Sequence, residues 1–244
     1  MKREYWYILM AYTAMHLSSF IVAPILFLLG NFLGEDAVEF QINASVGWIV
    51  FSFTATLFIV LFLLRKEIRT EFSPHGGASF GASLLWAVGG IFLALTAQVI
   101  AANIEAWMGI EMGSENTEQI LTVIETVPIF IIVSSIIGPI LEEIVFRKII
   151  FGVLYKRLKF FLSALLSSVI FALAHGEPEH LLLYSAIGFT FAFLYVKTKR
   201  IIVPIIAHVS MNTMVVLIQS VFREDIERYI REYEQIQSFI GGLF

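Results

Sequence analysis

Residues 142–147 read Glu-Glu-Ile-Val-Phe-Arg and place two carboxylates and a guanidinium inside a long apolar stretch. Charged side chains are costly inside a lipid bilayer, and those that occur there usually serve a function. Glu143 and Arg147 are four residues apart with the acid first, so they are expected to form an ion pair on one helix face. Glu142 lies about 100° round the same helix and has no basic residue four positions away. It is therefore predicted to be the free carboxylate.

Two later segments add polar side chains to apolar runs. Phe171 and His175 are four residues apart near the end of one run. His208 and Asn212 share one face of another. At a helical rise of about 1.5 Å per residue, Glu142 and His175 lie roughly 22 and 24 Å from the basic ends of their runs. His208 and Asn212 lie roughly 12 and 18 Å from theirs, so all four side chains are predicted to converge on one polar cavity inside the membrane.

These residue types suit peptide hydrolysis, which needs an activated water, a proton for the leaving amine and stabilisation of an oxyanion. Glu142 with His175 can deprotonate a water and return the proton to the departing nitrogen. His208 and Asn212 can donate hydrogen bonds to the carbonyl oxygen as charge develops on it. The ion-paired acid and guanidinium of the first motif would hold the helix and its charges in place.

Zinc is the mechanistic alternative, because Glu142, His175 and His208 offer the nitrogen and oxygen ligands of an open three-ligand site. No His-Glu-x-x-His motif is present, however, and the hydrogen-bonding role available to Asn212 favours a mechanism without metal. We therefore expect no cofactor and keep zinc as the alternative. The absence of cysteine and of Gly-x-Ser-x-Gly disfavours cysteine and serine nucleophiles.

The composition is that of an integral membrane protein. Hydrophobic residues make up 58% of the 244 residues, 23 of them are phenylalanine, and only 15% of the chain is charged. A soluble domain of this length needs a polar shell, whereas here nearly every segment is apolar all round. Membrane lipid is thus the expected environment, and the net charge of −4 argues against nucleic acid as a partner.

Seven apolar runs separated by charged or turn-rich joints are expected to be helices. The predicted fold class is all-α, a polytopic transmembrane bundle of about seven to eight helices with an intramembrane polar cavity. The fourth run, at about 1.5 Å per residue, is far longer than a bilayer core of about 30 Å. Pro128 and the Gly138-Pro139 pair are expected to break it, as one kinked crossing rather than two. The runs cover about residues 5–29, 47–64, 80–103, 119–157, 160–174, 181–197 and 201–222.

Basic residues mark alternate joints, which predicts the orientation because short basic loops stay in the cytoplasm. The intervening joints, residues 30–46, 104–118 and 175–180, hold acids but no Lys or Arg and are predicted to face outward. The protein is therefore expected to be a multi-pass protein of the cell membrane with a cytoplasmic N-terminus. The basic joints contain Lys2 and Arg3; Arg65, Lys66 and Arg69; Lys156, Arg157 and Lys159; and Lys197, Lys199 and Arg200.

A single integral membrane domain is expected over residues 1–244, with a catalytic core at 119–222 and a short surface tail at 223–244. Mixed charges at helical spacing predict a short surface helix at residues 224–233. The first apolar run is far longer than the core of a signal peptide, so we interpret it as a retained helix. Three other histidines are interpreted as hydrogen-bonded anchors: His16, His75 and His180.

The ordered motifs E-E-x-x-x-R, F-x-x-x-H and H-x-x-x-N on successive membrane helices resemble those of the CPBP family of intramembrane proteases. This family, also called Abi, comprises CAAX-protein proteases and bacteriocin-processing enzymes. The resemblance covers roughly residues 119–222 and implies an intramembrane endopeptidase. The residues that it implies to be catalytic are Glu142, His175, His208 and Asn212, and those that it implies to be supporting are Glu143, Arg147 and Phe171.

The substrate is expected to be a membrane-anchored or hydrophobic peptide, because the outer loops are short and offer a globular substrate little to bind. Eukaryotic members of the family act on prenylated C-termini. The compact chain without a targeting sequence points instead to a bacterial member that processes small membrane peptides.

Two readings without catalysis stay open at this point. A transporter or proton relay would also place acids and histidines in the membrane, but it commonly shows repeated halves, and no repeat is visible in the sequence. A non-catalytic membrane scaffold would be free to lose motif residues, whereas this chain carries all of them.

Overall fold

The computed structural model describes residues 1–33, 37–71, 77–222, 228–229, 232–233 and 235–236, and among these it contains helices but no strand. The all-α prediction is thus confirmed. Most of the predicted tail helix at residues 224–233, and also His75, lie outside the described residues. The elements are α1 (Arg3–Leu33), α2 (Ala37–Glu71), α3 (Phe80–Trp107), α4 (Glu115–Thr126), α5 (Phe130–Ile132), η1 (Val133–Ile137), α6 (Gly138–Glu142), η2 (Glu143–Phe151), α7 (Gly152–Leu154), α8 (Phe160–Ala174), η3 (Pro178–His180), α9 (Leu181–Thr198) and α10 (Ile202–Val221).

Five of the described helices, α1, α2, α3, α9 and α10, are long and apolar enough to cross a membrane. The shorter apolar helix α8 and the composite helix of residues 130–154, which runs from α5 to α7, pack against these helices. Large apolar side chains such as Phe32 and Trp107, each 87% exposed, face outward, as they do where the surrounding solvent is lipid. The chain is therefore a multi-pass membrane protein.

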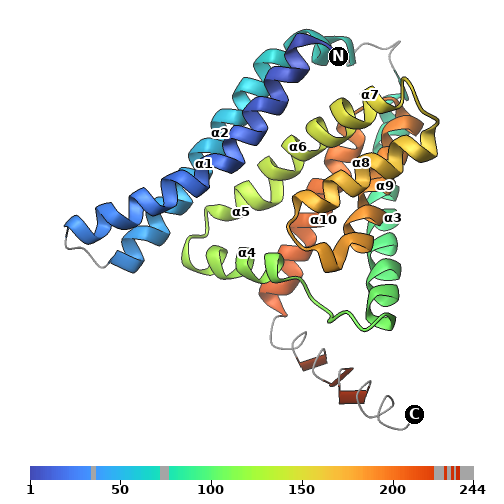
Figure 1. The fold of residues 1–244 in the computed structure, drawn as a ribbon. Helices are drawn as coiled ribbons and strands as arrows, with labels where there is room; N and C mark the ends of the chain where they lie inside the picture. The colour runs from blue at the N-terminus through green and yellow to red at the C-terminus, as the bar shows by residue number, and fades with distance from the viewer. Residues whose placement is uncertain (34–36, 72–76, 223–227, 230–231, 234, 237–244) are drawn as a thin grey trace.

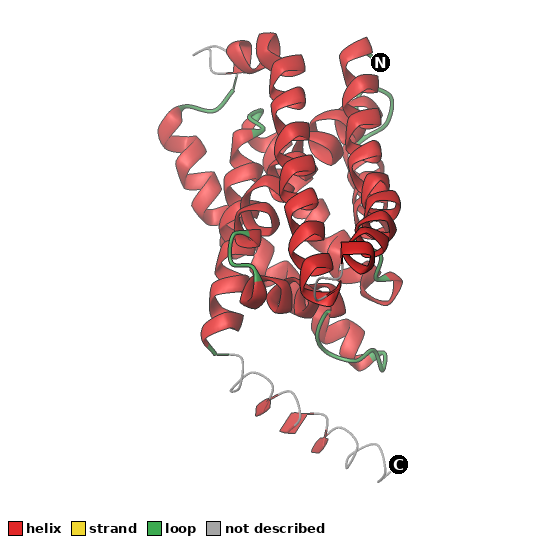
Figure 2. Ribbon diagram, turned by 90° about the vertical axis from the view of Figure 1, so that its left-hand side faces the viewer, coloured by secondary structure: helices red, strands yellow, loops and turns green. Residues whose placement is uncertain are grey.

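The helices form two groups that meet at the composite helix (Figures 1 and 2). The hairpin of α1 and α2 leans against one side of that helix, where Ile8, Val60 and Leu64 pack against Leu141 and Ile149. The remaining helices pack on the other side. A second apolar core joins α3, α9 and α10 through Ala87, Phe191, Leu194 and Ala207.

The fourth apolar run breaks only once, which corrects part of the prediction. The break at Pro128 is confirmed, because α4 ends at Thr126 and the composite helix starts afterwards in a different direction (Figure 1). The predicted break at Gly138-Pro139 is wrong. There the N–H of Gly138 donates to the carbonyl of Val133, five residues back, and this wider π-helical turn admits the proline without ending the helix. The run thus continues as one composite helix over residues 130–154, and its single crossing of the membrane stays a prediction.

The basic joints gather at one end of the bundle, the upper end in Figure 1. Lys2 Nζ pairs with Glu67 at 2.6 Å, and the N–H of Ala78 donates to the carbonyl of Thr198 at 2.9 Å. These contacts bring the N-terminus and the joints after α2 and α9 together. Which side of the membrane this end faces stays a prediction.

Neighbouring glycines in α3 provide a test of the packing between α3, α9 and α10. A Cβ on Gly90 would lie 2.5 Å from Leu194 Cδ1 and 3.3 Å from Ala207 Cβ, whereas a Cβ on Gly89 would meet nothing within 4 Å. We expect Gly90→Val to lower the free energy of unfolding by about 1–3 kcal/mol through overpacking, measured by thermal unfolding in detergent. Gly89→Val is the control, because it makes the same change in helix propensity without overpacking. Equal losses in the two variants would contradict this packing.

Candidate active site

Glu143 is the centre of a buried ion-pair network on η2. Its side chain is fully buried, and its Oε2 lies 3.3 Å from the Nε of Arg147, which confirms the predicted pair. Its Oε1 lies 2.9 Å from the Nδ1 of His208 on α10. Because a carboxylate paired with a guanidinium can only accept hydrogen bonds, His208 donates from Nδ1. One acid therefore fixes both the guanidinium and the orientation of an imidazole ring.

Glu142 lies on the other side of the same imidazole. Its Oε2 is 3.7 Å from the Nε2 of His208, and 21% of its side chain is exposed. The prediction that Glu142 has no cationic partner holds only for its own helix, since the histidine comes from α10. Glu142 is also close enough to His175 and to His16 of α1 for electrostatic interaction. His208 thus stands between two consecutive carboxylates.

Aromatic rings replace hydrogen bonds around the Arg147 guanidinium, whose side chain is 1% exposed. Its central carbon lies 4.1 Å from the ring centroid of Phe171, 5.5 Å from that of Phe191 and 6.0 Å from that of Phe146. Within the described part of the chain its three nitrogens have no hydrogen-bond partner. A desolvated guanidinium gains from aromatic faces and from its ion pair, so these rings offset part of its burial cost.

His175 follows the last residue of α8, and three contacts orient its ring. Its Nδ1 lies 2.8 Å from the carbonyl oxygen of Phe171, which can only accept, so Nδ1 carries the proton and Nε2 offers a lone pair when the ring is neutral. The ring stacks on Tyr184 at a centroid distance of 4.1 Å and meets the edge of Phe171 at 4.4 Å. Gly176 takes a left-handed conformation with φ of 78°, which lets the chain turn directly after the histidine.

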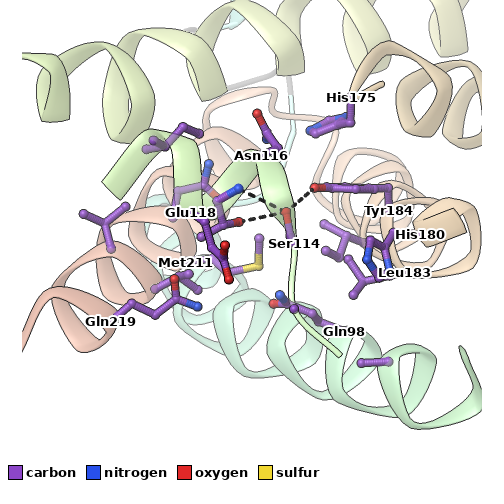
Figure 3. A pocket seen from close by; sticks show the side chains of 18 of the residues that line it. Gln98, Ser114, Asn116, Glu118, His175, His180, Leu183, Tyr184, Met211 and Gln219 are labelled. Carbon is purple, nitrogen blue, oxygen red and sulfur yellow. Dashed lines mark hydrogen bonds between the residues drawn. The ribbon is translucent and has the colours of Figure 1, made fainter. Parts of the chain in front are cut away.

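A cavity of about 450 Å³ reaches these groups between α3, α4, α9 and α10 (Figure 3). Its lining includes Phe171, His175, His208 and Asn212, so the predicted polar cavity brings most of the candidate residues together. Glu142 is not part of that lining and lies on the side of the composite helix that faces α1. The side-chain amide of Asn212 makes no hydrogen bond with another residue of the described ranges.

Some residues near the site could not be found from the motifs. Tyr12 and His16 of α1 both interact electrostatically with Glu142. The ring of His16 contacts the rings of Tyr12 at 4.7 Å and Phe53 at 5.5 Å. It has no hydrogen-bond partner among the described residues, which differs from the predicted hydrogen-bonded anchor. The one feature of the sequence that could have indicated Tyr12 and His16 is their spacing of four residues on an apolar helix. His180 does act as an anchor, with Nδ1 3.0 Å from Glu105.

Glu177 connects the loop after His175 to α4. Its carboxylate accepts hydrogen bonds from the hydroxyl of Ser114, the N-terminal cap of α4, from the N–H of Asn116 and from the hydroxyl of Tyr184. Burial by itself raises the pKa of this carboxyl, but the hydrogen bonds to its charged form outweigh burial and hold the pKa below its usual value. Glu177 thus fixes α4 as a wall of the cavity and holds the ring that stacks on His175.

Of the three predicted zinc ligands, Glu142 and His208 lie close together, with Oε2 and Nε2 3.7 Å apart, but the three do not form one close group among the described residues. Among the described residues, one group of three histidine or carboxylate ligands lies within 4.8 Å of one another, namely Glu177, Glu179 and His180. That group does not include Glu142, His175 or His208. Three ligands of one zinc ion lie about 2 Å from it and therefore close to one another, so His175 would have to approach the other two for zinc to bind at the predicted residues.

Several known proteins are similar to this chain in sequence. The sequence model of the family described as "Type II CAAX prenyl endopeptidase Rce1-like" matches residues 124–214, which carry all the motif residues. A Bacillus subtilis protein named membrane peptidase YdiL is 49% identical over 246 residues and covers the whole of both chains. The chain belongs to the Rce1-like CAAX endopeptidase family. Membrane-embedded CAAX protease MroQ of Staphylococcus aureus is 40% identical over 141 residues, 55% of this chain and 57% of that protein. No solved structure matches.

Membership of the Rce1-like family makes the chain a membrane-embedded peptidase. The part matched by the family model begins within α4 and ends within α10. It contains the ion pair, the two carboxylates beside His208 and the ring of His175. The α1–α2 hairpin, which lies beside Glu142, is outside it.

The Glu143–Arg147 pair of this Rce1-like peptidase predicts a stability cycle. Arg147→Met should cost about 3–5 kcal/mol in the free energy of unfolding, because it leaves the Glu143 carboxylate buried without its cation. Adding Glu143→Gln should recover at least half, since glutamine removes the charge but still accepts from His208 Nδ1. Thermal unfolding in detergent measures both variants. A double variant as unstable as the sum of the singles would contradict the pairing.

The Glu177 contacts predict a pH dependence. A carboxyl whose pKa is lower in the folded state stabilises the fold above its unfolded pKa, and this stabilisation is lost as pH falls through the folded value. We expect the difference in unfolding temperature between wild type and Glu177→Gln to be constant from pH 8 to about 6 and to shrink below about pH 4.5. A difference that persists unchanged at the lowest pH would show that the carboxylate is not responsible.

Proposed function

We propose that this protein is an intramembrane endopeptidase in which Glu142 and His175 activate the attacking water and His208 and Asn212 stabilise the oxyanion. The observation that carries this proposal is the position of His208 between two carboxylates at the wall of a cavity that also reaches His175 and Asn212. Glu143 and Arg147 are proposed to position these groups without touching substrate, and Phe171 is proposed to support the His175 ring from the cavity lining.

The proposed general base consists of a carboxylate and a neutral imidazole. His175 donates Nδ1–H to Phe171, so its Nε2 is free to take a proton from water. Glu142 lies close enough to His175 for the two charges to interact, and both groups are proposed to polarise the same water. The proton then passes to the amide nitrogen as the C–N bond breaks, which leaves a carboxylic acid and an amine.

The proposed oxyanion donors come from one face of α10. Asn212 offers an amide N–H that is free of other hydrogen bonds within the described residues. His208 already donates from Nδ1 to Glu143, so donation from Nε2 requires the doubly protonated ring. In that form the carboxylates of Glu142 and Glu143 face two cations, the imidazolium and the Arg147 guanidinium, so the charges of the cluster cancel.

The proposed substrate is a membrane-anchored or hydrophobic peptide, because the site lies among helices that are apolar on their outer faces. The protein named MroQ, with 40% identity over part of the chain, carries the words membrane-embedded CAAX protease in its name. The proposed mechanism uses no metal. The spacing of the candidate zinc ligands supports this, since they are not part of the close group of ligands among the described residues.

Cleavage of membrane-anchored fluorogenic peptides by purified protein in detergent tests the proposal. We expect Glu142→Gln and His175→Ala each to lower kcat by about 10²–10⁴, the usual contribution of a general acid or base. Glu125→Gln, an exposed acid of α4 that does not line the cavity, is the matched control and should keep its activity. Unfolding temperatures of all variants separate loss of chemistry from loss of fold.

Chelation supplies the second arm of the experiment. Activity that survives chelator but is lost in both variants is the expected result. Loss on chelation with recovery on adding zinc would replace the proposed mechanism with a zinc-dependent one. Turnover within tenfold of wild type in both variants would contradict the assigned roles. The proposal would also be contradicted if the wild-type protein cleaved none of the peptides and Glu142→Gln left its binding to a partner unchanged, as expected of a scaffold.

A further inference from the structure

The cavity extends well beyond the candidate catalytic groups, and side-chain carboxamides lie along it. His208, Asn212 and Gln219 follow one another along the cavity side of α10, and Gln98 faces the same space from α3. Figure 3 shows Gln98 and Gln219 projecting from their two helices toward the space beside Met211. On α10 these polar side chains alternate with the apolar lining residues Met211, Val215 and Val216.

The side-chain amides of Gln98 and Gln219 are open for further hydrogen bonds as far as the structure describes the chain. Within the described residues, neither the side-chain amide of Gln98 nor that of Gln219 forms a hydrogen bond. By contrast, Asn103 on the exposed part of α3 donates its amide to the carbonyl of Val99 at 2.7 Å. Both glutamines are partly exposed at the cavity, so their amide donors and carbonyl acceptors are available to a ligand that has both acceptors and donors.

The length of the cavity fits a short stretch of extended chain. Eleven residues separate His208 from Gln219, which is roughly 16 Å along the helix at 1.5 Å per residue. An extended peptide covers about 3.3 Å per residue, so about five residues span that distance. The volume of about 450 Å³ lies in the range of cavities that enclose small organic ligands.

Hydrolysis inside a membrane also requires hydrogen-bond partners for the backbone of the substrate. A substrate helix satisfies its own backbone, but its scissile amide becomes accessible only when the helix unwinds. The freed N–H and C=O groups then lack partners in an apolar environment, at a cost of several kcal/mol each. A carboxamide offers two donors and an acceptor and can serve either group of a peptide bond, whatever the substrate side chains are.

We propose that this cavity binds about five residues of substrate in an extended conformation, with the carboxamides of Gln98 and Gln219 bonded to its peptide groups. The inference rests on the proposed function and names the form of the substrate for the same site. Substrate specificity then depends on the backbone conformation of the substrate rather than on its side chains. Segments that unwind readily, such as those rich in glycine, are bound in preference to regular apolar helices.

Binding to a substrate-like probe tests the inference without turnover. The probe is a fluorescein-labelled decapeptide of alternating leucine and glycine, and its analogue has every glycine replaced by N-methylglycine, which removes those N–H donors. Affinity is measured by fluorescence anisotropy on Glu142→Gln protein in detergent, after subtraction of binding to empty micelles. The same protein is compared with versions that also carry Gln98→Met and Gln219→Met together, or Gln119→Met.

Gln119 is the matched control, because it is an exposed glutamine of α4 that does not line the cavity. We expect the two cavity substitutions to weaken the leucine–glycine probe about tenfold and Gln119→Met to change it less than twofold. The N-methylated analogue should bind about tenfold more weakly than the parent to the unaltered cavity, and this difference should largely vanish when both glutamines are methionine. Such non-additivity is the signature of a direct contact.

Additive effects of N-methylation and the glutamine substitutions would overturn the inference, and so would failure of the parent probe to bind. The comparison of the two probes on the unaltered cavity needs no variant there, so misfolding of a methionine variant cannot hide the answer. Failure of the proposed chemistry is distinguishable, because it alters cleavage by wild type while leaving this binding unchanged.

Discussion

A charge buried in an apolar environment must have its counter-charge beside it, and this constraint determines the centre of the structure. Glu143 meets it with Arg147 on its own helix and with His208 from α10. Two helices that are far apart in sequence are therefore bound at one depth. Because either acid or guanidinium alone would be strongly destabilising, the position of the candidate catalytic groups is tied to the stability of the fold.

Aromatic contacts and hydrogen bonds connect the Glu143–Arg147 pair to residues farther from it. Phe171 supports both the guanidinium of Arg147 and the ring of His175, and its carbonyl sets the tautomer of the histidine. Tyr184 stacks on the other face of His175 and donates to Glu177, which in turn holds the first turn of α4. A continuous set of contacts therefore joins the buried ion pair to the wall of the cavity.

The sequence predicts what depends on local spacing and leaves open what depends on packing. The Glu143–Arg147 pair, the all-α fold and the break at Pro128 follow from spacing, hydropathy and the chemistry of proline. The continuous helix through Pro139 does not, because a π-helical turn depends on the surrounding packing. The depths of the motifs predict that Glu142 and His208 converge on one cavity, but they do not specify which atoms meet. The nearness of α1 to Glu142 is a contact between helices that no pattern within either helix specifies.

The lengths of the helices have a consequence for the membrane around the site. α1 has 31 residues and a length of about 46 Å, whereas α10 has 20 residues and spans about 30 Å, close to the thickness of a hydrocarbon core. The longer hairpin must tilt to match the bilayer, and its tilt changes with lipid acyl-chain length. Because α1 carries Tyr12 and His16 beside Glu142, hydrophobic mismatch acts directly on the surroundings of that carboxylate. The thickness of the lipid bilayer therefore affects the geometry of the site.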